Sequence, residues 1–435
     1  MFAILASGRA RWVVLAVAIG AALAGCGSSG TVQGGNDTYS ATTLTVYSDL
    51  PLLGPDGAQM ASIVDGEILA LYNHGGHVGK LHVSLESLND YPDASVSDPL
   101  LPDPLRSARS QIGESAYTAS SDLSTAAYIG DYDSAATAIS LPLNNQNDIL
   151  QISPGSPYVG FTDANAADLA GDPGAFDPYG TSTFARLVPS DAVEARAALS
   201  WMRSLGVRRL ALLSDDSNAP ENFNGVIATE VASDAAAAGI TIVGDRSGID
   251  TASLTSPAGY ARVAAAVAAE HPDAILLGGS ADAGAAALWQ ALHAAAPGAK
   301  LFAPSTLATP AFLRALGAAA SATYVTSPIL EPSQYPAAAQ AVFAQYHRVF
   351  SAAPSAYVLY GYDAMNDILA AIAKAGRNAP SRPHLRSAFF ALGRSGFKGT
   401  LGDYTIDAAG DTSLQRFDGY RVGRGGVLVL AREIS

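Results

Sequence analysis

Residues 210–243 read LALLSDDSNAPENFNGVIATEVASDAAAAGITIV, and this stretch carries the pattern that decides the fold. A short apolar run at 210–213 is followed by a polar turn, an alanine-rich helical segment and a second apolar run at 240–243. Short apolar strands that alternate with helices are typical of parallel sheets covered by helices on both faces. The stretch therefore predicts an α/β protein built around a parallel sheet.

A separate series of such units precedes this one, so we expect two similar lobes. Two long helices are expected at 335–350 and 357–375, before β-prone pieces near the end of the chain. Asp191 lies three residues before Glu194, which predicts a capping box at the start of a helix. The expected strands are 44–47, 81–85, 127–129 and 149–152 in the first series, 210–213, 240–243, 274–277, 301–303 and 324–326 in the second, and 400–406, 417–422 and 427–430 at the end.

Composition excludes several classes of protein. The 435 residues are 49% hydrophobic and 15% charged, so the chain can bury enough apolar surface to fold. The net charge of −14 argues against a nucleic-acid partner, because nucleic-acid binding needs a basic surface. The single cysteine excludes an internal disulfide and a cysteine-rich zinc site.

The N-terminus has the order of regions found in secretory signals. Arg9 and Arg11 precede an apolar run at 12–23, and small residues lead to Cys26. The run is shorter than the roughly 20 apolar residues that span a membrane. The sequence Leu-Ala-Gly-Cys at 23–26 resembles the bacterial lipobox, which implies that residues 1–25 are removed and that Cys26 carries the lipid. The alternative is an ordinary secretory signal with an incidental cysteine.

Residues 26–42 are rich in Gly, Ser, Thr and Asn, which indicates a flexible tether between the anchor and the folded body. If Cys26 is lipidated, the body is held close to the outer side of a membrane. We therefore expect an extracytoplasmic protein, lipid-anchored to the bacterial cell membrane.

Several short motifs follow one another in an order that resembles a known family. Together they cover nearly all of the chain after the tether, and they are similar to those of type I periplasmic binding proteins of the leucine/isoleucine/valine-binding class. The motifs are LLGP at 52–55, DG at 65–66, NHGGHVG at 73–79, YIG at 128–130, ISPG at 152–155 and YGYDA at 360–364.

The resemblance implies two Rossmann-like lobes with parallel sheets flanked by helices. Three hinge crossings, near 184–187, 326–328 and 403–410, would join the lobes and let them close on a small solute. Lobe 1 would comprise residues 43–185 plus 328–404, and lobe 2 residues 186–327 plus 405–435. Lipoprotein members of this family deliver their solute to an ABC permease.

The position of the ligand can also be argued from the strands alone. In open parallel sheets, ligands bind beyond the carboxyl ends of the strands, where turns and helix N-termini present backbone N–H groups. The turns in question are 49–58, 131–135, 153–158, 214–223, 278–282 and 304–306.

The family resemblance assigns roles to particular residues in these turns. Ser134 matches the serine that binds the ligand carboxylate, together with free N–H groups at the start of its helix, and Gly155 matches a residue that makes backbone contacts. The alternatives are that Ser134 is a plain helix N-cap and Gly155 a turn glycine. The full set of expected ligand-binding residues is Gln59, Tyr132, Asp133, Ser134, Ala135, Gly155, Ser156, Phe223, Ser280 and Ser305.

The sequence also departs from the family pattern. Ser305 stands where amino-acid binders often place the acid that holds the ligand ammonium, and Ser280 replaces an aromatic residue. An unpaired ammonium in a closed cleft is costly, so another acid is expected to replace the lost one. Asp133, Asp215 and Asp282 are candidates, although helix capping is the other role open to them. The sequence leaves open whether a branched-chain amino acid is the ligand.

Enzyme and metal-binding functions find little support. His74, His77 and His82 suggest a metal site, but they surround a glycine turn away from the predicted cleft, with no acid in that turn. There is no G-x-S-x-G elbow, P-loop or G-x-G-x-x-G turn after a strand. We therefore expect no catalysis, no cofactor and no metal.

The leading hypothesis is a solute-binding lipoprotein that captures an amino acid, amide or related polar compound for an ABC importer. Its expected partners are the solute, the permease subunits and the membrane. The alternative is a ligand sensor or envelope interaction protein of the same fold that feeds no transporter.

Overall fold

The computed structural model describes residues 42–54, 56–91, 104–164, 172–215, 223–249, 254, 256–279, 281 and 283–434. The chain divides into two compact units, Met1–Thr38 and Tyr39–Ser435, and only the second contains described residues. The predicted signal, Cys26 and nearly all of the tether lie outside them. In the described part of the chain, no helix has the length and apolar character needed to cross a membrane.

The first sheet has six strands in the order β2-β3-β1-β4-β5-β6. All neighbours run parallel except β2, which pairs antiparallel with β3. The strand order reverses at β1, because β3 lies on one side of it and β4 on the other. Such a switch point leaves a crevice at the carboxyl ends of the strands. The strands are β1 (Thr43–Leu50), β2 (His77–Val78), β3 (Leu81–Asn89), β4 (Thr125–Ile129), β5 (Leu150–Ser153) and β6 (Phe184–Arg186).

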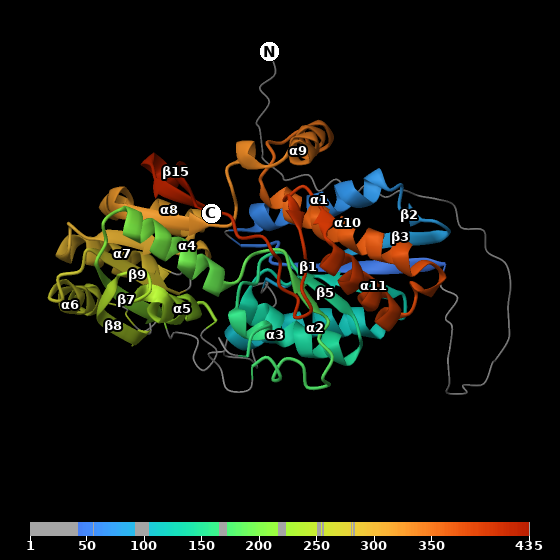
Figure 1. Cartoon of the computed structure of the whole chain (residues 1–435), viewed down its shortest axis with the longest axis horizontal. Helices are drawn as coiled ribbons and strands as arrows, with labels where there is room; N and C mark the ends of the chain where they lie inside the picture. The colour runs from blue at the N-terminus through green and yellow to red at the C-terminus, as the bar shows by residue number, and fades with distance from the viewer. Residues whose placement is uncertain are drawn as a thin grey trace, which may run out of the picture. The chain divides into compact units, whose positions relative to one another are not determined.

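Helices cover both faces of this sheet (Figure 1). Val46 of β1 packs in a core with α9, α10 and α11, whereas its neighbour Tyr47 packs against α2. Successive strand side chains point to opposite faces, which explains this division. The helices are α1 (Gly57–Asn73), α2 (Pro104–Ser121), α3 (Ser134–Gln146), α9 (Ala337–Phe350), α10 (Tyr357–Ala375) and α11 (Arg382–Ser395).

Two glycines allow α1 and α10 to pack backbone against backbone. A Cβ at Gly66 would lie 2.0 Å from the Val358 carbonyl oxygen, and one at Gly361 would lie 1.9 Å from the Ile63 carbonyl oxygen. Any side chain at either position would push the helices apart. The glycines therefore fix the position of α1, whose first turn faces the crevice.

The second sheet has seven strands in the order β15-β14-β11-β10-β9-β7-β8. The strands from β11 to β8 run parallel, and β14 and β15 add an antiparallel edge. Here the order reverses at β7, which lies between β8 and β9. The strands are β7 (Arg209–Asp215), β8 (Thr241–Ile249), β9 (Ala274–Gly278), β10 (Lys300–Ala303), β11 (Thr323–Ser327), β14 (Phe417–Val422) and β15 (Leu428–Ile434).

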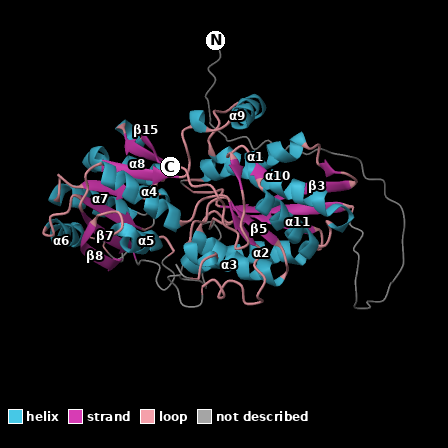
Figure 2. Ribbon diagram, viewed as in Figure 1, coloured by secondary structure: helices cyan, strands magenta, loops and turns pink. Residues whose placement is uncertain are grey.

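Helices also cover both faces of this sheet, and Figure 2 shows them in cyan around its magenta strands. One core joins the sheet to α4 and α5, and a second core joins it to α6, α7 and α8. All five residues of β9 are buried, as expected for a central strand with helices on both sides. The helices are α4 (Asp191–Ser204), α5 (Val226–Ala235), α6 (Pro257–Ala268), α7 (Ala283–Ala295) and α8 (Pro310–Ala315).

The chain passes between the two sheets three times: after β6, after β11 and before β14. An ion pair links the first and third passages, because Arg186 Nε lies 2.6 Å from Asp411 Oδ1. The Arg186 backbone N–H also donates to the Gly410 carbonyl oxygen at 3.0 Å. Arg186 is fully buried, whereas the Asp411 side chain is 32% exposed, so solvent partly screens the pair that joins the two passages.

The predicted α/β fold with two helix-flanked, mainly parallel sheets is confirmed, and the structure differs from the local predictions at three places. Helix α11 was not expected. Residues 400–406 contain only β13 (Asp403–Tyr404), which pairs with β12 (Phe397–Lys398). The capping box does not form: Ser190 is the N-cap of α4, and no side chain caps that helix. The Glu194 side chain instead turns into the protein interior, where other donors satisfy it.

Candidate functional site

A cavity of about 460 Å³ lies at the carboxyl ends of the strands. The first sheet contributes the turns after β1, β4 and β5, and the second contributes the turns after β7, β9 and β10. These turns include both switch points, where open α/β sheets bind ligands. Most of the wall is apolar, with a small number of polar groups, which is typical of small-molecule sites.

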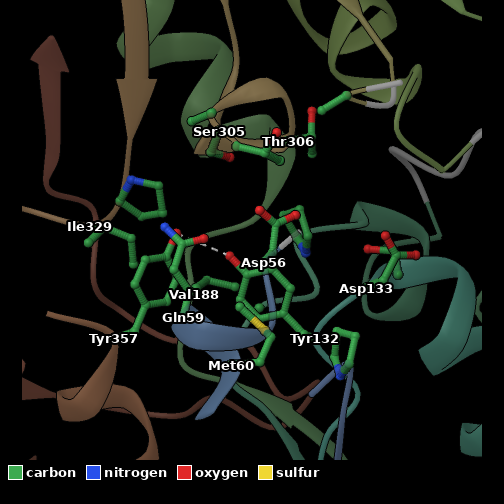
Figure 3. Close-up of a pocket in the computed structure, with 18 of the residues that line it drawn as sticks. Asp56, Gln59, Met60, Tyr132, Asp133, Val188, Ser305, Thr306, Ile329 and Tyr357 are labelled. Carbon is green, nitrogen blue, oxygen red and sulfur yellow. Dashed lines mark hydrogen bonds between the residues drawn. The ribbon is translucent and has the colours of Figure 1, made fainter. Parts of the chain in front are cut away.

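Six of the ten residues expected from the sequence lie on the cavity wall, and they come from both sheets (Figure 3). The six are Gln59, Tyr132, Asp133, Ser134, Gly155 and Ser305. Their assignment as ligand-binding residues stays a prediction.

Three of the others lie elsewhere, and Ser280 lies outside the described residues. Ala135 is exposed on α3 and is not among the residues of the wall. Ser156 is fully buried, and its hydroxyl lies 2.6 Å from that of Thr137. Phe223 packs edge-on against Tyr158 in an aromatic core. Ser156 and Phe223 thus take part in the packing of the fold, and the assignment of all three as ligand-binding residues stays a prediction.

The N-terminus of α3 is capped by an acid. Asp133 is the N-cap, and its Oδ1 accepts a hydrogen bond of 2.7 Å from the Ala135 N–H. Ser134 is the first helical residue, so the alternative that it is the N-cap is wrong. Its hydroxyl is buried and accepts from the Tyr158 N–H at 3.3 Å. The helix start thus already holds one carboxylate, that of Asp133.

The turn after β10 is held by a second acid. Glu194 is 1% exposed, and its carboxylate accepts from the Ser305 N–H at 2.6 Å and from the Ser305 hydroxyl at 2.5 Å. The Thr326 hydroxyl donates to the same carboxylate at 2.6 Å. Burial raises the pKa of Glu194, and these three hydrogen bonds oppose that rise. An acid is therefore close to Ser305, but its hydrogen-bonding capacity is used inside the protein.

Asp56 is a third acid, and the sequence analysis did not single it out. It precedes α1 and lies on the cavity wall, yet its side chain makes no capping hydrogen bond. Its Oδ1 is buried and has no hydrogen-bond partner. Burial raises the pKa of Asp56, because a carboxylate that loses water without gaining a partner is disfavoured. In the view of Figure 3 it lies between Tyr132 and the Ser305–Thr306 turn.

Two tyrosines form an aromatic part of the wall beside Asp56. The hydroxyls of Tyr132 and Tyr357 are 3.5 Å apart, and their ring centroids are separated by 6.1 Å. Burial raises the pKa of both hydroxyls, and the negative charge of Asp56 adds to the rise in each. Tyr357, which the sequence analysis also missed, begins α10 three residues before the family motif at 360–364.

Gly155 leaves room for the Tyr132 ring. A Cβ at this position would lie 2.3 Å from the ring, so no other residue fits without displacing Tyr132. Gly54 does the same for Tyr91, since its Cβ would lie 2.5 Å from that ring, and its φ of +82° is one that glycine adopts most easily. Both glycines therefore shape the cavity through the aromatic side chains they accommodate.

The three acids expected to hold an ammonium have different positions. Asp133 is on the wall but caps α3. Asp215 ends β7, is 2% exposed and is not among the residues of the wall. Asp282 lies outside the described residues. No arginine, lysine or histidine occurs in the described part of the cavity wall.

A buried cluster of three more acids lies near the turns after β1 and β4. The Tyr128 hydroxyl donates to Asp49 Oδ2 at 2.9 Å and lies 3.1 Å from Asp131 Oδ1. Burial raises the pKa of Asp49 to about 6 and raises those of Asp90 and Asp131 well above the ordinary value. The charge of Asp133 contributes to the shift of Asp90, so this acidic region extends to the cavity wall.

The histidines of the glycine turn do not form a metal site in the structure. The rings of His77 and His82 lie side by side, 4.9 Å apart, across the β2–β3 pair. Over the residues that the structure describes, no group of three His, Cys, Asp or Glu side chains is placed to hold a metal ion.

Comparison with known proteins identifies one family model. The model described as "Periplasmic binding protein" matches residues 119–425. No curated protein matches the sequence.

Solved structures with a similar fold are numerous. A leucine-binding protein from Thermotoga maritima has 19% identity and a TM-score of 0.68, with 90% of this chain and 98% of that chain covered. An ABC transporter solute-binding protein from R. palustris in complex with benzoate has 18% identity and a TM-score of 0.65, over 90% and 96% of the two chains. A branched-chain amino acid binding protein from Streptococcus pneumoniae in complex with isoleucine has 14% identity and a TM-score of 0.65, over 90% and 99%. At these identities the likeness concerns the fold.

Proposed function

Since the chain belongs to the periplasmic binding protein family, we propose that it is an extracytoplasmic receptor that captures a small solute and delivers it to an ABC importer. The observation that carries the proposal is the cavity of about 460 Å³ at the carboxyl ends of the strands of both sheets. This volume lies within the range of roughly 300–1,000 Å³ that small-molecule sites occupy. The similar structures include ABC transporter proteins in complex with isoleucine and with benzoate, which supports a small organic ligand.

The three passages between the sheets suggest how binding is signalled. A ligand that contacts both sides of the cavity favours the arrangement in which both sides can reach it. A permease that recognises this arrangement then distinguishes the loaded receptor from the empty one. The Arg186–Asp411 pair, whose arginine is buried, lies at two of the three passages and holds them together as the lobes move.

The proposed anchor is a lipid on Cys26, which follows the predicted signal. Replacing Cys26 with Ser is expected to release the protein from membranes into the soluble fraction, because it removes the thiol that would carry the lipid. Retention of Cys26→Ser in the membrane fraction would show that something other than lipid on this residue holds the chain.

Solute binding is tested by thermal unfolding of the full chain, purified in mild detergent, against a panel of amino acids, amides, amines, polyols and aromatic acids. A ligand that binds only the native state at 100 times its Kd stabilises it by about 2.7 kcal/mol, which raises the Tm by several degrees. At least one class of solute is expected to give such a rise. If no member of the panel changes the Tm, the receptor function is wrong.

A further inference from the structure

We propose that the cavity selects an organic cation, namely a molecule with an ammonium group that Asp56 binds and an apolar or aromatic body, without a carboxylate. This inference rests on the proposed function and specifies the chemistry of the solute. It differs from the expectation drawn from the sequence, in which the start of α3 holds a ligand carboxylate.

The charge of the cavity wall favours a cationic ligand over an anionic one. Asp56 and Asp133 are both lining residues, and the described lining residues include no basic side chain to balance them. The acids Asp49, Asp90 and Asp131 lie behind this wall, where burial raises their pKa values and disfavours their charged forms. A ligand with a positive charge is attracted to such a site, whereas an anion is repelled.

Three of the donors expected to bind a ligand carboxylate are already bonded to carboxylates of the protein. At the start of α3 the Ala135 N–H is bonded to Asp133, and the Ser134 hydroxyl accepts from the Tyr158 N–H. On the opposite side of the cavity, both the N–H and the hydroxyl of Ser305 are bonded to Glu194. A ligand carboxylate would have to displace Asp133 to reach the Ala135 N–H and Glu194 to reach Ser305, whereas the Ser134 hydroxyl keeps a proton that it can donate. A site for an anion instead needs several donors that are free to bond to the ligand.

An ammonium group would give the Asp56 carboxylate a partner that it lacks within the protein. Its Oδ1 is buried and has no hydrogen-bond partner, although the residue lies on the cavity wall. Burying a charged group without a partner is unfavourable, and an ammonium supplies both a hydrogen-bond donor and the opposite charge. The raised pKa of Asp56 is consistent with this, since a bound cation would lower it again.

The remaining wall suits an apolar or aromatic body. The rings of Tyr132 and Tyr357 lie next to Asp56, where a cation can also contact an aromatic face. Met60, Val188 and Ile329 extend the apolar surface. An arylalkyl amine, with its charge at one end and its ring at the other, matches this division between an acidic corner and an apolar wall.

Three probes with the same phenyl body separate the charge of the head group from the rest of the ligand. They are 2-phenylethylamine, which is a cation, 2-phenylethanol, which is neutral, and phenylacetate, which is an anion. Calorimetry on the full chain in detergent is expected to give a Kd for the amine about ten- to a hundredfold lower than for either other probe. Leucine, which carries both an ammonium and a carboxylate, is expected to bind more weakly than the amine.

The variant Asp56→Asn tests the assigned partner, and Asp403→Asn is its matched control. Asp403 is an exposed aspartate of β13 that does not line the cavity, so its substitution removes the same charge elsewhere. Asp56→Asn is expected to abolish the preference for the amine over 2-phenylethanol without changing the apo Tm. Asp403→Asn is expected to leave the preference intact.

Several results would overturn the inference. Tighter binding of phenylacetate or leucine would show that the site accepts a carboxylate, while leaving the receptor function in place. An amine preference that survives in Asp56→Asn would remove Asp56 as the partner. Failure of all three phenyl probes would exclude arylalkyl amines, and only failure of the whole panel of solutes would exclude the receptor function as well.

Discussion

Two opposite walls of the cavity each have an acid, and the two acids differ in how they are satisfied. Behind the Ser305 wall (Ser305 and Thr306), the Glu194 carboxylate accepts three hydrogen bonds and is 1% exposed. On the α1 wall (Asp56, Gln59 and Met60), Asp56 Oδ1 is buried with no partner. A satisfied buried acid stabilises the fold, whereas an unsatisfied acid on a cavity is available to a ligand.

The comparison also explains why an acid near Ser305 does not make an ammonium site there. The carboxylate oxygens of Glu194 accept hydrogen bonds from the Ser305 N–H, the Ser305 hydroxyl and the Thr326 hydroxyl. Glu194 therefore positions the turn after β10. The α1 wall offers the opposite case, because the backbone of its helix is fixed by packing against α10 and its acid is left without a role in the fold. The two acids differ in whether hydrogen-bond donors surround them. Glu194 has three donors within reach, whereas Asp56 Oδ1 has none.

The largest expected effect comes from Glu194→Ala. This substitution leaves three donors near Ser305 and Thr326 without their acceptor, and the free energy of unfolding should fall by about 3–5 kcal/mol. Urea denaturation followed by circular dichroism measures the loss. The matched substitution Asp56→Ala should change the free energy of unfolding by less than about 0.5 kcal/mol or increase it, because it removes an unpartnered buried oxygen. Equal losses of unfolding free energy in the two variants would show that Glu194 and Asp56 contribute alike to the stability of the fold.

A smaller effect is expected where the α1 wall is held by the fold. Gly361→Ala places a Cβ within 1.9 Å of the Ile63 carbonyl oxygen, so α1 must move away from α10. Overpacking of this kind costs about 1–3 kcal/mol in stability, and the shift should also weaken amine binding because it displaces Asp56.

The control for this variant is Gly113→Ala in α2. A Cβ at Gly113 would meet no atom within 4 Å, so the substitution should stabilise the protein by about 0.5–1 kcal/mol. Thermal unfolding and calorimetry on both variants separate a packing effect from a general effect of replacing helical glycine. If Gly361→Ala behaves like Gly113→Ala, the contact of the two helices does not fix the α1 wall.

Much of the fold could be predicted because parallel strands have a local signature. The run at 274–277 is short and apolar between polar turns, and it became the fully buried β9. Helix α11 was missed although Ser381 is its N-cap and Pro383 lies in its first turn, a common helix start, because its charged residues obscure the apolar stripe of Leu385 and Phe389. Local patterns therefore identify central elements better than peripheral ones.

The site was harder to predict, for a physical reason. The turn at 49–58 was expected to lie on the ligand site, yet nothing local shows that Asp56 lacks a partner. Asp191 and Glu194 have the spacing of a capping box, but donors from residues 305 and 326, more than 100 positions away, determine where Glu194 points. Which acids are satisfied depends on tertiary contacts, and spacing along the chain does not contain them.

The most direct test of the central claim is a crystal structure of the protein with 2-phenylethylamine. We expect the ligand nitrogen to lie within about 3 Å of a carboxylate oxygen of Asp56, a hydrogen-bonding distance, with the ring against Tyr132 and Tyr357. The hydrogen bonds of Asp133 to the start of α3 and of Glu194 to Ser305 should remain intact. A nitrogen bound away from Asp56, or a ligand seated in place of either of those protein carboxylates, would contradict it.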